Sequence, residues 1–257
     1  MTHRLLDQLD GWKQRHYKGL LVLIDPDKSE PASLRRVLSE SERCGVDLLM
    51  VGGSLTHGAD IQDIVLEIKQ LSPIPVLLFP GSLYQIAPAA DGILFLSLIS
   101  GRNPDLLIGR QVEAAPILRK TKLEVIPTAY MLVDSGKPTT AHYMSNTQPI
   151  PHDKPDIAAA TALAGEMLGL RLAYLDGGSG AQIPVSAEMV RRAAETLRIP
   201  LMIGGGIRTA HAALTAWRAG ADMLVIGTAL EQDPDCRILH DIADARAAYL
   251  QQHPVLP

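Results

Sequence analysis

Residues 201–226, LMIGGGIRTAHAALTAWRAGADMLVI, contain one complete strand–helix–strand unit and indicate the class of fold. The apolar run Leu201–Ile203 is followed by glycines, then by a segment of helical period, Thr209–Ala219, and then by a second apolar run, Met223–Ile226. The threonine that opens the helical segment suits an N-cap, and Gly220 stands at the C-cap position. Neither run alternates apolar with polar residues, which is the pattern of parallel strands that helices cover.

The same unit recurs along the chain. Six more apolar runs are expected to be strands: Leu20–Ile24, Leu48–Val51, Val76–Phe79, Ile93–Leu98, Leu123–Ile126 and Leu172–Leu175. The other helical segments are Pro31–Cys44, Ile61–Leu71, Pro104–Arg119, Asp156–Leu168, Ser186–Leu197 and Asp235–Leu250. Eight strands that alternate with helices predict an α/β fold, a single (β/α)8 TIM barrel over residues 1–257, with an open doubly wound sheet as the rival.

Three segments depart from the plain repeat. Only Pro80–Gly92 separates the third strand from the fourth, so the helix after strand three must be short or replaced by a loop. The amphipathic segment Leu5–His16 precedes the first strand and is expected to cover the lower end of the barrel or to pack against its flank. Residues Asp134–Pro155 are polar and rich in Pro, Thr and Ser. Loops of this length are usually functional, so we expect this one to lie over the active site.

The composition argues against several classes of protein. The chain has 257 residues, of which 47% are hydrophobic and 20% charged, so it can bury a large core. A net charge of −4 without a basic patch argues against nucleic acid as a partner. The two cysteines, Cys44 and Cys236, have no CxxC spacing, which disfavours a disulfide or zinc site and fits a reducing cytoplasm. No apolar run reaches the roughly 18 residues of a membrane span, and the N-terminus lacks the apolar core of a signal peptide.

Glycines follow the sixth, seventh and eighth predicted strands, at the end of a barrel where active sites form. They lie in Asp176-Gly177-Gly178-Ser179-Gly180, in Gly204-Gly205-Gly206-Ile207 and in Gly227-Thr228. Glycine lets backbone N–H groups approach an anion closely, and the helix that starts near Thr209 adds a partial positive charge. Together the three loops predict a phosphate site, although each alone could simply end a strand.

Oxygen donors follow the first two predicted strands. Asp25 comes directly after the first strand, and Ser54 follows Gly52 and Gly53 after the second. A carboxylate and a hydroxyl at neighbouring strand ends suit Mg²⁺, which takes few protein ligands and fills its other positions with water and substrate phosphates. Asp25 precedes Pro26, so a simple turn or capping role is an equal alternative.

The motifs carry a family resemblance over nearly the whole chain. In chain order they are Leu23–Lys28, Val51–Ser54, Pro75–Ser82, Phe95–Pro104, Tyr143–Thr147, Tyr174–Gly180 and Ile203–Arg208. The set resembles the signatures of geranylgeranylglyceryl phosphate synthase, in the group II type of bacteria and archaea. The segments Ser100–Pro104 and Tyr174–Gly180 are the most selective, because many phosphate-binding barrels share the glycines alone.

The resemblance implies a prenyltransferase of ether lipid biosynthesis. The C3 hydroxyl of sn-glycerol 1-phosphate would attack C1 of geranylgeranyl diphosphate, giving geranylgeranylglyceryl phosphate and diphosphate. Glycerol 1-phosphate would be bound by Tyr174, Leu175, Asp176, Gly177, Gly178, Ser179, Gly180, Gly205, Gly206, Gly227 and Thr228. Asp25 and Ser54 would hold Mg²⁺, which stabilises the departing diphosphate. Arg102 and Asn103 would contact the diphosphate, with plain surface solvation as the alternative.

Asp176 and Tyr174 are the catalytic residues that the resemblance implies. The family usually has Glu followed by Ala where this chain has Asp176-Gly177, and that carboxylate is the family's general base. Aspartate is one methylene shorter, so it would act through a water or on an acceptor that lies deeper. Two alternatives stay open: Asp176 could only position the glycerol hydroxyls, and Tyr174 could be strand-end packing.

An isoprenoid of twenty carbons needs a long apolar groove. Candidate lining residues are Leu78, Pro80, Gly81, Leu98, Ala129, Tyr130 and Leu132, with core packing as the alternative. The length of the groove stays open, and so does an acceptor such as 3-phosphoglycerate, for which Arg208 is the nearest cation.

The motifs are also compatible with a noncatalytic phosphate- or prenyl-binding barrel and with a sugar-phosphate isomerase or epimerase, which needs a second acid–base group facing Asp176. The resemblance further implies a cytoplasmic homodimer or homohexamer with transient membrane contact.

Overall fold

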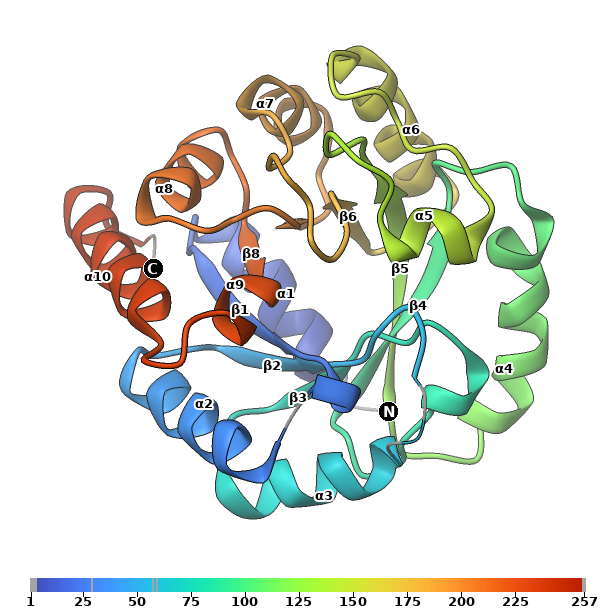
Figure 1. Ribbon diagram of the computed structural model, residues 1–257. Coiled ribbons are helices and arrows are strands. Elements are labelled where there is room, and N and C mark those ends of the chain that lie inside the picture. The colour runs from blue at the N-terminus through green and yellow to red at the C-terminus, as the bar shows by residue number, and fades with distance from the viewer. Residues whose placement is uncertain (1–3, 29, 57, 59, 256–257) are drawn as a thin grey trace.

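In the computed structural model, eight parallel strands close into a barrel in which each strand pairs with the next and β8 pairs with β1 (Figure 1). The strands are β1 (Gly19–Ile24), β2 (Leu48–Val51), β3 (Val76–Leu78), β4 (Gly92–Leu98), β5 (Glu124–Leu132), β6 (Leu172–Asp176), β7 (Leu201–Gly204) and β8 (Met223–Ile226). The structure describes residues 4–28, 30–56, 58 and 60–255. The closed order confirms the predicted (β/α)8 barrel and excludes the open sheet.

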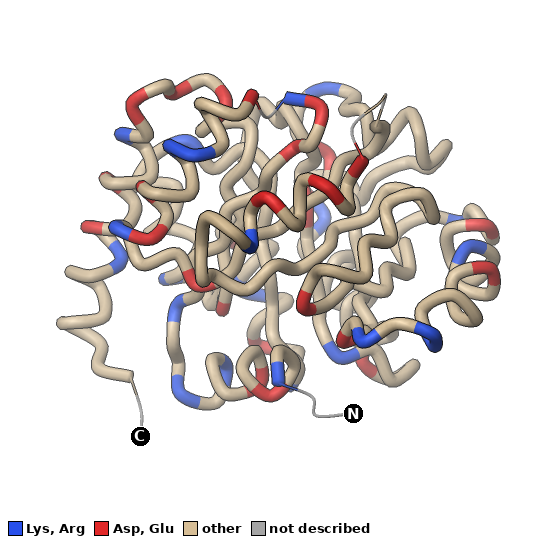
Figure 2. Tube along the Cα trace, turned by 90° about the horizontal axis from the view of Figure 1, so that it is seen from below, with Lys and Arg blue, Asp and Glu red and all other residues tan. Residues whose placement is uncertain are grey.

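A ring of helices surrounds the barrel (Figure 1). It comprises α2 (Pro31–Arg43), α3 (Ile61–Leu71), α4 (Arg110–Leu118), α6 (Pro155–Met167), α7 (Ala187–Thr196), α8 (Ala210–Arg218) and α10 (Arg237–Gln252). The predicted caps are present: the Thr209 side chain accepts the N–H of Ala212, and Gly220 has a left-handed φ of 112° after α8. Figure 2 shows acidic and basic residues interspersed along the trace.

Side chains on the inner face of the strands fill the barrel, and helix α1 (Arg4–Gln14) closes its amino-terminal end. Leu5, Leu9 and Trp12 of α1 pack in the same buried cluster as strand residues from the barrel interior. The Glu124 carboxylate accepts the N–H groups of Leu5 and Leu6 at 2.7 and 2.9 Å, which anchors the start of the helix. The first of the two predicted positions for this segment is therefore confirmed. With the amino-terminal end covered, the carboxyl ends of the strands are the open end of the barrel, where active sites of this fold form.

Strand β5 is longer than its apolar run, and the prediction that it ends at Ile126 is wrong. Pro127 continues the strand because its carbonyl accepts the N–H of Arg171 at 2.8 Å. The hydroxyl of Thr128 donates to the carbonyl of Ile126 at 2.8 Å, so this buried polar group is satisfied within the strand. The extension places Tyr130 on a strand that ends at the mouth of the barrel.

Short helical turns occupy several strand–helix connections. After β3 the 3-10 turn η2 (Leu83–Gln85) stands where a full helix would be, which confirms the modified connection after strand three. The other turns are η1 (Pro26–Lys28) after β1, the π-turn η3 (Asp105–Gly109) before α4, α5 (Thr140–Ser145) after β5 and α9 (Thr228–Glu231) after β8. Helix α5 lies within the polar segment for which the sequence predicts a loop. In the part of the chain that is described, no helix combines the length and apolarity that crossing a bilayer requires.

Candidate active site

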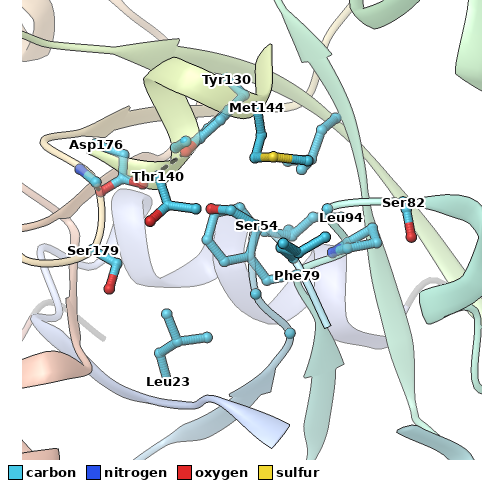
Figure 3. A pocket seen from close by; sticks show the side chains of 18 of the residues that line it. Leu23, Ser54, Phe79, Ser82, Leu94, Tyr130, Thr140, Met144, Asp176 and Ser179 are labelled. Carbon is cyan, nitrogen blue, oxygen red and sulfur yellow. Dashed lines mark hydrogen bonds between the residues drawn. The ribbon is translucent and has the colours of Figure 1, made fainter. Parts of the chain in front are cut away.

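A cavity of about 930 Å³ lies at the carboxyl ends of the strands (Figure 3). The loops after β6, β7 and β8 form one side of it, and the ends of β1 and β2 form another. From there the cavity extends between η2 on one flank and β4 with α4 on the other. Thr140 and Met144 of α5 also line it, so the polar segment after β5 does lie over the mouth.

The loop after β7 is shaped for the close approach of an anion. Gly205 and Gly206 have positive φ angles of 80° and 74°. A Cβ on Gly205 would lie 2.7 Å from the Gly177 nitrogen, and one on Gly206 would lie 2.7 Å from the Pro184 nitrogen. Among the described residues, neither glycine donates its N–H to a protein acceptor. These donors, together with the N-terminus of α8, are the kind of groups that bind a phosphate.

The predicted phosphate residues divide into two groups. Those that line the cavity are Tyr174, Asp176, Gly178, Ser179, Gly180, Gly205, Gly206, Gly227 and Thr228. The Ser179 and Thr228 hydroxyls lie 3.1 Å apart and link the loops after β6 and β8. Leu175 and Gly177 are not part of the lining. The Leu175 side chain packs toward the helices, and the N–H of Gly177 already donates to the Gly204 carbonyl at 3.0 Å.

Asp176 ends β6 as a buried carboxylate with two donors (Figure 3). The Tyr130 hydroxyl donates to Oδ2 at 2.7 Å, and the N–H of Gly178 donates to Oδ1 at 2.8 Å. Burial raises the pKa of Asp176 above its usual range, although both hydrogen bonds and the nearby His142 favour the charged form. A carboxylate whose proton affinity is raised in this way is suited to general-base chemistry.

Three aromatic rings form the floor of the cavity below Asp176. Phe79, Tyr130 and Tyr174 have ring centroids 5.4 to 5.5 Å apart. Burial raises the pKa of both tyrosines well above the usual value, so their hydroxyls stay neutral donors. The Tyr174 hydroxyl has no hydrogen-bond partner among the described residues, and it lies against Gly204, where no side chain could fit. Tyr174 is therefore both packed and able to donate to a ligand.

Asp25 and Ser54 line the same end of the cavity, as predicted. The side chain of Asp25 is only one-fifth exposed, and its Oδ2 pairs with the Lys28 ammonium at 2.7 Å. The buried Gln85 of η2 holds the loop after β2, because its Nε2 donates to the Gly53 carbonyl at 2.8 Å and its Oε1 accepts the Gly81 N–H at 3.0 Å. No group of three His, Cys, Asp or Glu residues able to hold a metal occurs in the described ranges. The oxygen donors fit a cation that takes one or two protein ligands and completes its shell with water and phosphate.

Arg102 and Asn103 do not line the cavity. The Arg102 guanidinium donates to the Gly101 carbonyl at 2.8 Å, and the Asn103 amide donates to the Ser145 carbonyl at 2.8 Å. Both side chains thus fix the loop after β4 and its contact with α5. Their contact with diphosphate stays a prediction that this arrangement does not favour.

The apolar part of the cavity lies along the flank where the short turn η2 stands in place of a full helix after β3. Among the predicted groove residues, Pro80, Gly81, Leu98, Tyr130 and Leu132 line the cavity, whereas Leu78 and Ala129 do not. Leu78 lies in the layer between barrel and helices, and a Cβ on Gly165 of α6 would lie 2.7 Å from the Ala129 methyl. The prediction for these two residues is wrong because they lie on the outer face of their strands. The groove continues past Leu96 to Ile117 and Leu118 of α4.

Several residues of the site have no sequence motif that points to their role. Tyr130 is predicted only to line the groove, and its hydrogen bond to Asp176 depends on the β5–β6 register that places it beside Tyr174. Gln85 and Glu231 come from short turns that hydrophobic periodicity does not reveal. Lys28 stands in a predicted motif, but its pairing with Glu231 depends on closure of the barrel between β1 and β8.

Comparison with known proteins gives consistent results. The model of the PcrB family matches residues 10–246. A geranylgeranylglyceryl phosphate synthase from Spirosoma linguale is 51% identical over 88% of this chain and 91% of its own length, and one from Korarchaeum cryptofilum is 43% identical over 84% and 88%. The crystal structure of (S)-3-O-geranylgeranylglyceryl phosphate synthase from Thermoplasma acidophilum in complex with sn-glycerol-1-phosphate has a TM-score of 0.88 and 37% identity, covering 94% of this chain and 97% of that one.

Proposed function

Because the chain belongs to the PcrB family, we propose that it joins geranylgeranyl diphosphate to the C3 hydroxyl of sn-glycerol 1-phosphate, forming geranylgeranylglyceryl phosphate and diphosphate. One observation carries the proposal: the buried carboxylate of Asp176 shares a single cavity with the free N–H groups of Gly205 and Gly206 and with Asp25. The names of the relatives, and the glycerol phosphate bound to the Thermoplasma acidophilum protein, support the same reaction.

The acceptor is bound on the side of the glycine loops. Its phosphoryl group accepts hydrogen bonds from the N–H groups of Gly205 and Gly206 and from the hydroxyls of Ser179 and Thr228. Its glycerol part reaches toward Asp176 and the Tyr174 hydroxyl. Because these groups come from three neighbouring strand ends, they hold the C3 hydroxyl in one orientation toward the middle of the cavity.

Asp176 accepts the proton of the C3 hydroxyl as the oxygen attacks C1 of the prenyl chain. The electron pair of the broken C1–O bond moves to the departing diphosphate. Burial favours the uptake of a proton by Asp176, and the Tyr130 hydrogen bond keeps the carboxylate charged before the acceptor is deprotonated. Aspartate is shorter than the glutamate usual in the family, so the acceptor lies deeper or a water relays the proton.

The prenyl chain occupies the apolar groove between η2 and α4. Each buried methylene contributes about 0.8 kcal/mol, so the groove supplies most of the affinity for the donor. The 3-10 turn after β3 is what makes room for it, since a full helix at that position would fill this flank. The depth of the groove near Ile117 and Leu118 determines the preferred chain length.

Mg²⁺ is the metal that we assign to Asp25 and Ser54. A Cβ on Gly53 would lie 3.6 Å from Asp25 Oδ1, so the loop that carries Ser54 passes directly beside the carboxylate. Carboxylate and hydroxyl oxygens are hard ligands of the kind that Mg²⁺ takes, and the remaining positions suit diphosphate oxygens and water. When bound, the ion would neutralise charge on the leaving group.

The experiment that tests the proposal is a transfer assay with purified protein, Mg²⁺, labelled geranylgeranyl diphosphate and each enantiomer of glycerol phosphate. We expect an extractable prenyl ether with sn-glycerol 1-phosphate, and absence of product with both enantiomers would overturn the proposal. A noncatalytic barrel would bind both ligands without turnover until Asp176→Glu restored it. Donors from C10 to C35, and 3-phosphoglycerate as acceptor beside Arg208, test the variants of the same reaction.

A sugar-phosphate isomerase is less compatible with the site. That chemistry needs a second acid–base group facing Asp176, and Tyr130 keeps its proton because burial raises its pKa. His142 does not line the cavity, and burial lowers its pKa.

We propose further that the protein works in the cytoplasm as a homodimer or homohexamer with transient membrane contact. Both cysteines are free thiols, as in a reducing compartment. Ile108 and Val112 expose more than half of their side chains near and on α4, where apolar surface favours association.

A further inference from the structure

The leaving diphosphate carries several negative charges, and a single Mg²⁺ neutralises only part of them. Cationic side chains at the end of the cavity where the diphosphate binds, near Asp25, would neutralise the rest. Three cations line the cavity among the described residues. Arg208 follows β7 on the acceptor side, where it donates to the Ala181 carbonyl at 3.0 Å, and Arg110 pairs with Glu113 at 3.1 Å on α4. Lys28 alone of the three follows β1, three residues after Asp25.

Lys28 lies between two carboxylates. Its ammonium is 2.7 Å from Asp25 Oδ2 and 3.1 Å from Glu231 Oε2. Lys28 belongs to η1, and Glu231 to α9 after β8, so the bridge crosses the seam where β8 meets β1. All three side chains line the cavity, and that of Lys28 is 48% exposed.

The electrostatics of the bridge show that Lys28 is held as a cation. A lysine side chain is a cation at neutral pH, and here its ammonium lies within ion-pair distance of two carboxylates. The ammonium is thus charged and anchored at the very carboxylate that we assign to the metal. The carboxylate of Asp25 therefore pairs with Lys28 and is also the group that we assign to the cation.

We propose that Lys28 binds the diphosphate of the prenyl donor and that Glu231 is the positioning residue that keeps the ammonium at the mouth. This inference rests on the proposed function. When the donor arrives with its cation, Lys28 leaves Asp25 and donates to diphosphate oxygens, while Glu231 retains its contact. As the C1–O bond breaks and its electron pair moves to the diphosphate, the ammonium stabilises the added charge. Lys28 takes the role predicted for Arg102 and Asn103, whose side chains are engaged with backbone carbonyls.

If Lys28 exchanges Asp25 for the diphosphate, Lys28→Met should affect the affinity for diphosphate and the affinity for Mg²⁺ differently. Binding of diphosphate in the presence of Mg²⁺, measured by calorimetry and as product inhibition, falls about 10- to 100-fold, as expected for loss of a charged hydrogen bond. Binding of Mg²⁺ alone becomes equal to or tighter than in the wild type, because Asp25 loses its competitor. Lys28→Arg retains most of the diphosphate affinity. The matched control is Lys154→Met, which removes another ion-paired lysine outside the cavity and leaves both affinities unchanged.

Glu231→Gln tests the positioning role through a double-mutant cycle. Alone it weakens diphosphate binding several-fold, and in the Lys28→Met background it has no further effect, because Glu231 acts through Lys28. An additive loss in the double variant, or weaker Mg²⁺ binding in Lys28→Met, would contradict the inference.

The experiment distinguishes a failure of the inference about Lys28 from a failure of the proposed function. If the wild type forms the prenyl ether but Lys28→Met binds Mg²⁺-diphosphate within twofold of it, the inference about Lys28 is wrong and the function stands. If the wild type binds Mg²⁺-diphosphate without forming the ether, the function is wrong, and the comparison with Lys28→Met still decides the role of the lysine. If the wild type binds no diphosphate, both are wrong.

Discussion

The hydrogen bond from Tyr130 to Asp176 gives a prediction for the pH dependence of the reaction. The Tyr130 hydroxyl donates to Oδ2 at 2.7 Å in a fully buried setting, and this bond favours the charged carboxylate. Tyr130→Phe removes only the hydroxyl and keeps the ring against Phe79 and Tyr174. The carboxylate then loses a donor, so its pKa rises further and the base is protonated over a wider range of pH.

The size of the effect follows from the energy of a hydrogen bond to a charged group. Such a bond contributes about 1.5 to 3 kcal/mol, and about 1.4 kcal/mol corresponds to one pH unit or to tenfold in rate. The acidic limb of the profile of kcat/KM against pH should therefore shift to higher pH by about one unit or more. Below that limb the variant should be about tenfold slower than the wild type, and well above it the two rates should converge.

The assay is the transfer reaction at saturating Mg²⁺ over a range of pH, with Tyr249→Phe as the matched control. Tyr249 lies on α10, stacked on His253 and away from the cavity, so the loss of its hydroxyl should leave the profile unchanged. A Tyr130→Phe profile with an unmoved acidic limb and a uniform loss of rate would refute Asp176 as a base held by Tyr130. It would point to a purely positional role for the carboxylate.

Three further predictions concern the same cavity. Asp176→Asn should abolish transfer yet raise the melting temperature at neutral pH by about 2 °C or more per kcal/mol gained. Folding raises the pKa of Asp176, so at any pH above the usual pKa of an aspartate the buried charge destabilises the folded wild type. Near pH 3 the carboxyl is protonated in both states, so thermal melts should show no difference between Asp176→Asn and the wild type. Gly206→Ala should raise KM for glycerol 1-phosphate about tenfold while KM for the donor stays constant, because its Cβ meets the Pro184 nitrogen. Gly169→Ala controls for backbone strain in the same kinetic assay, since Gly169 also has a positive φ, of 90°, but has open space around it. Ile117→Trp should slow transfer from a C20 donor and spare a C10 donor, whereas Ile157→Trp, on α6 outside the cavity, should change neither rate. Equal loss with both donors would contradict the course of the groove.

The sequence was sufficient for the barrel because its evidence is local and repeated. Most of the apolar runs are buried on both faces, as in β2, β6, β7 and β8, and helix caps such as Thr209 and Gly220 mark the connections. The same local signals predict too early an end for β5, since Pro127 and Thr128 break an apolar run without breaking the strand. The pairing of Pro127 and Thr128 with Phe95 and Leu96 of β4 shows why the strand continues.

The site was predictable to the extent that it depends on strand ends. Asp25, Ser54, Asp176 and the glycine loops follow predicted strands, and closure of the barrel brings them to one cavity. Which face of a strand a residue occupies is not predictable for continuous apolar runs, which is why the prediction for Leu78 and Ala129 is wrong. The contacts of Tyr130 with Asp176 and with Tyr174 depend on register, which a single sequence does not define.

We propose that the acceptor alcohol lies at Asp176 while the donor's diphosphate lies at Asp25, in one cavity. A crystal structure of the protein with sn-glycerol 1-phosphate, Mg²⁺ and diphosphate tests it most directly. We predict the phosphoryl group on the Gly205 and Gly206 N–H groups, the C3 hydroxyl within hydrogen-bond reach of Asp176, and the diphosphate with its ion at Asp25. A glycerol phosphate bound with its C3 hydroxyl turned away from Asp176, or a diphosphate bound elsewhere than at Asp25, would contradict it.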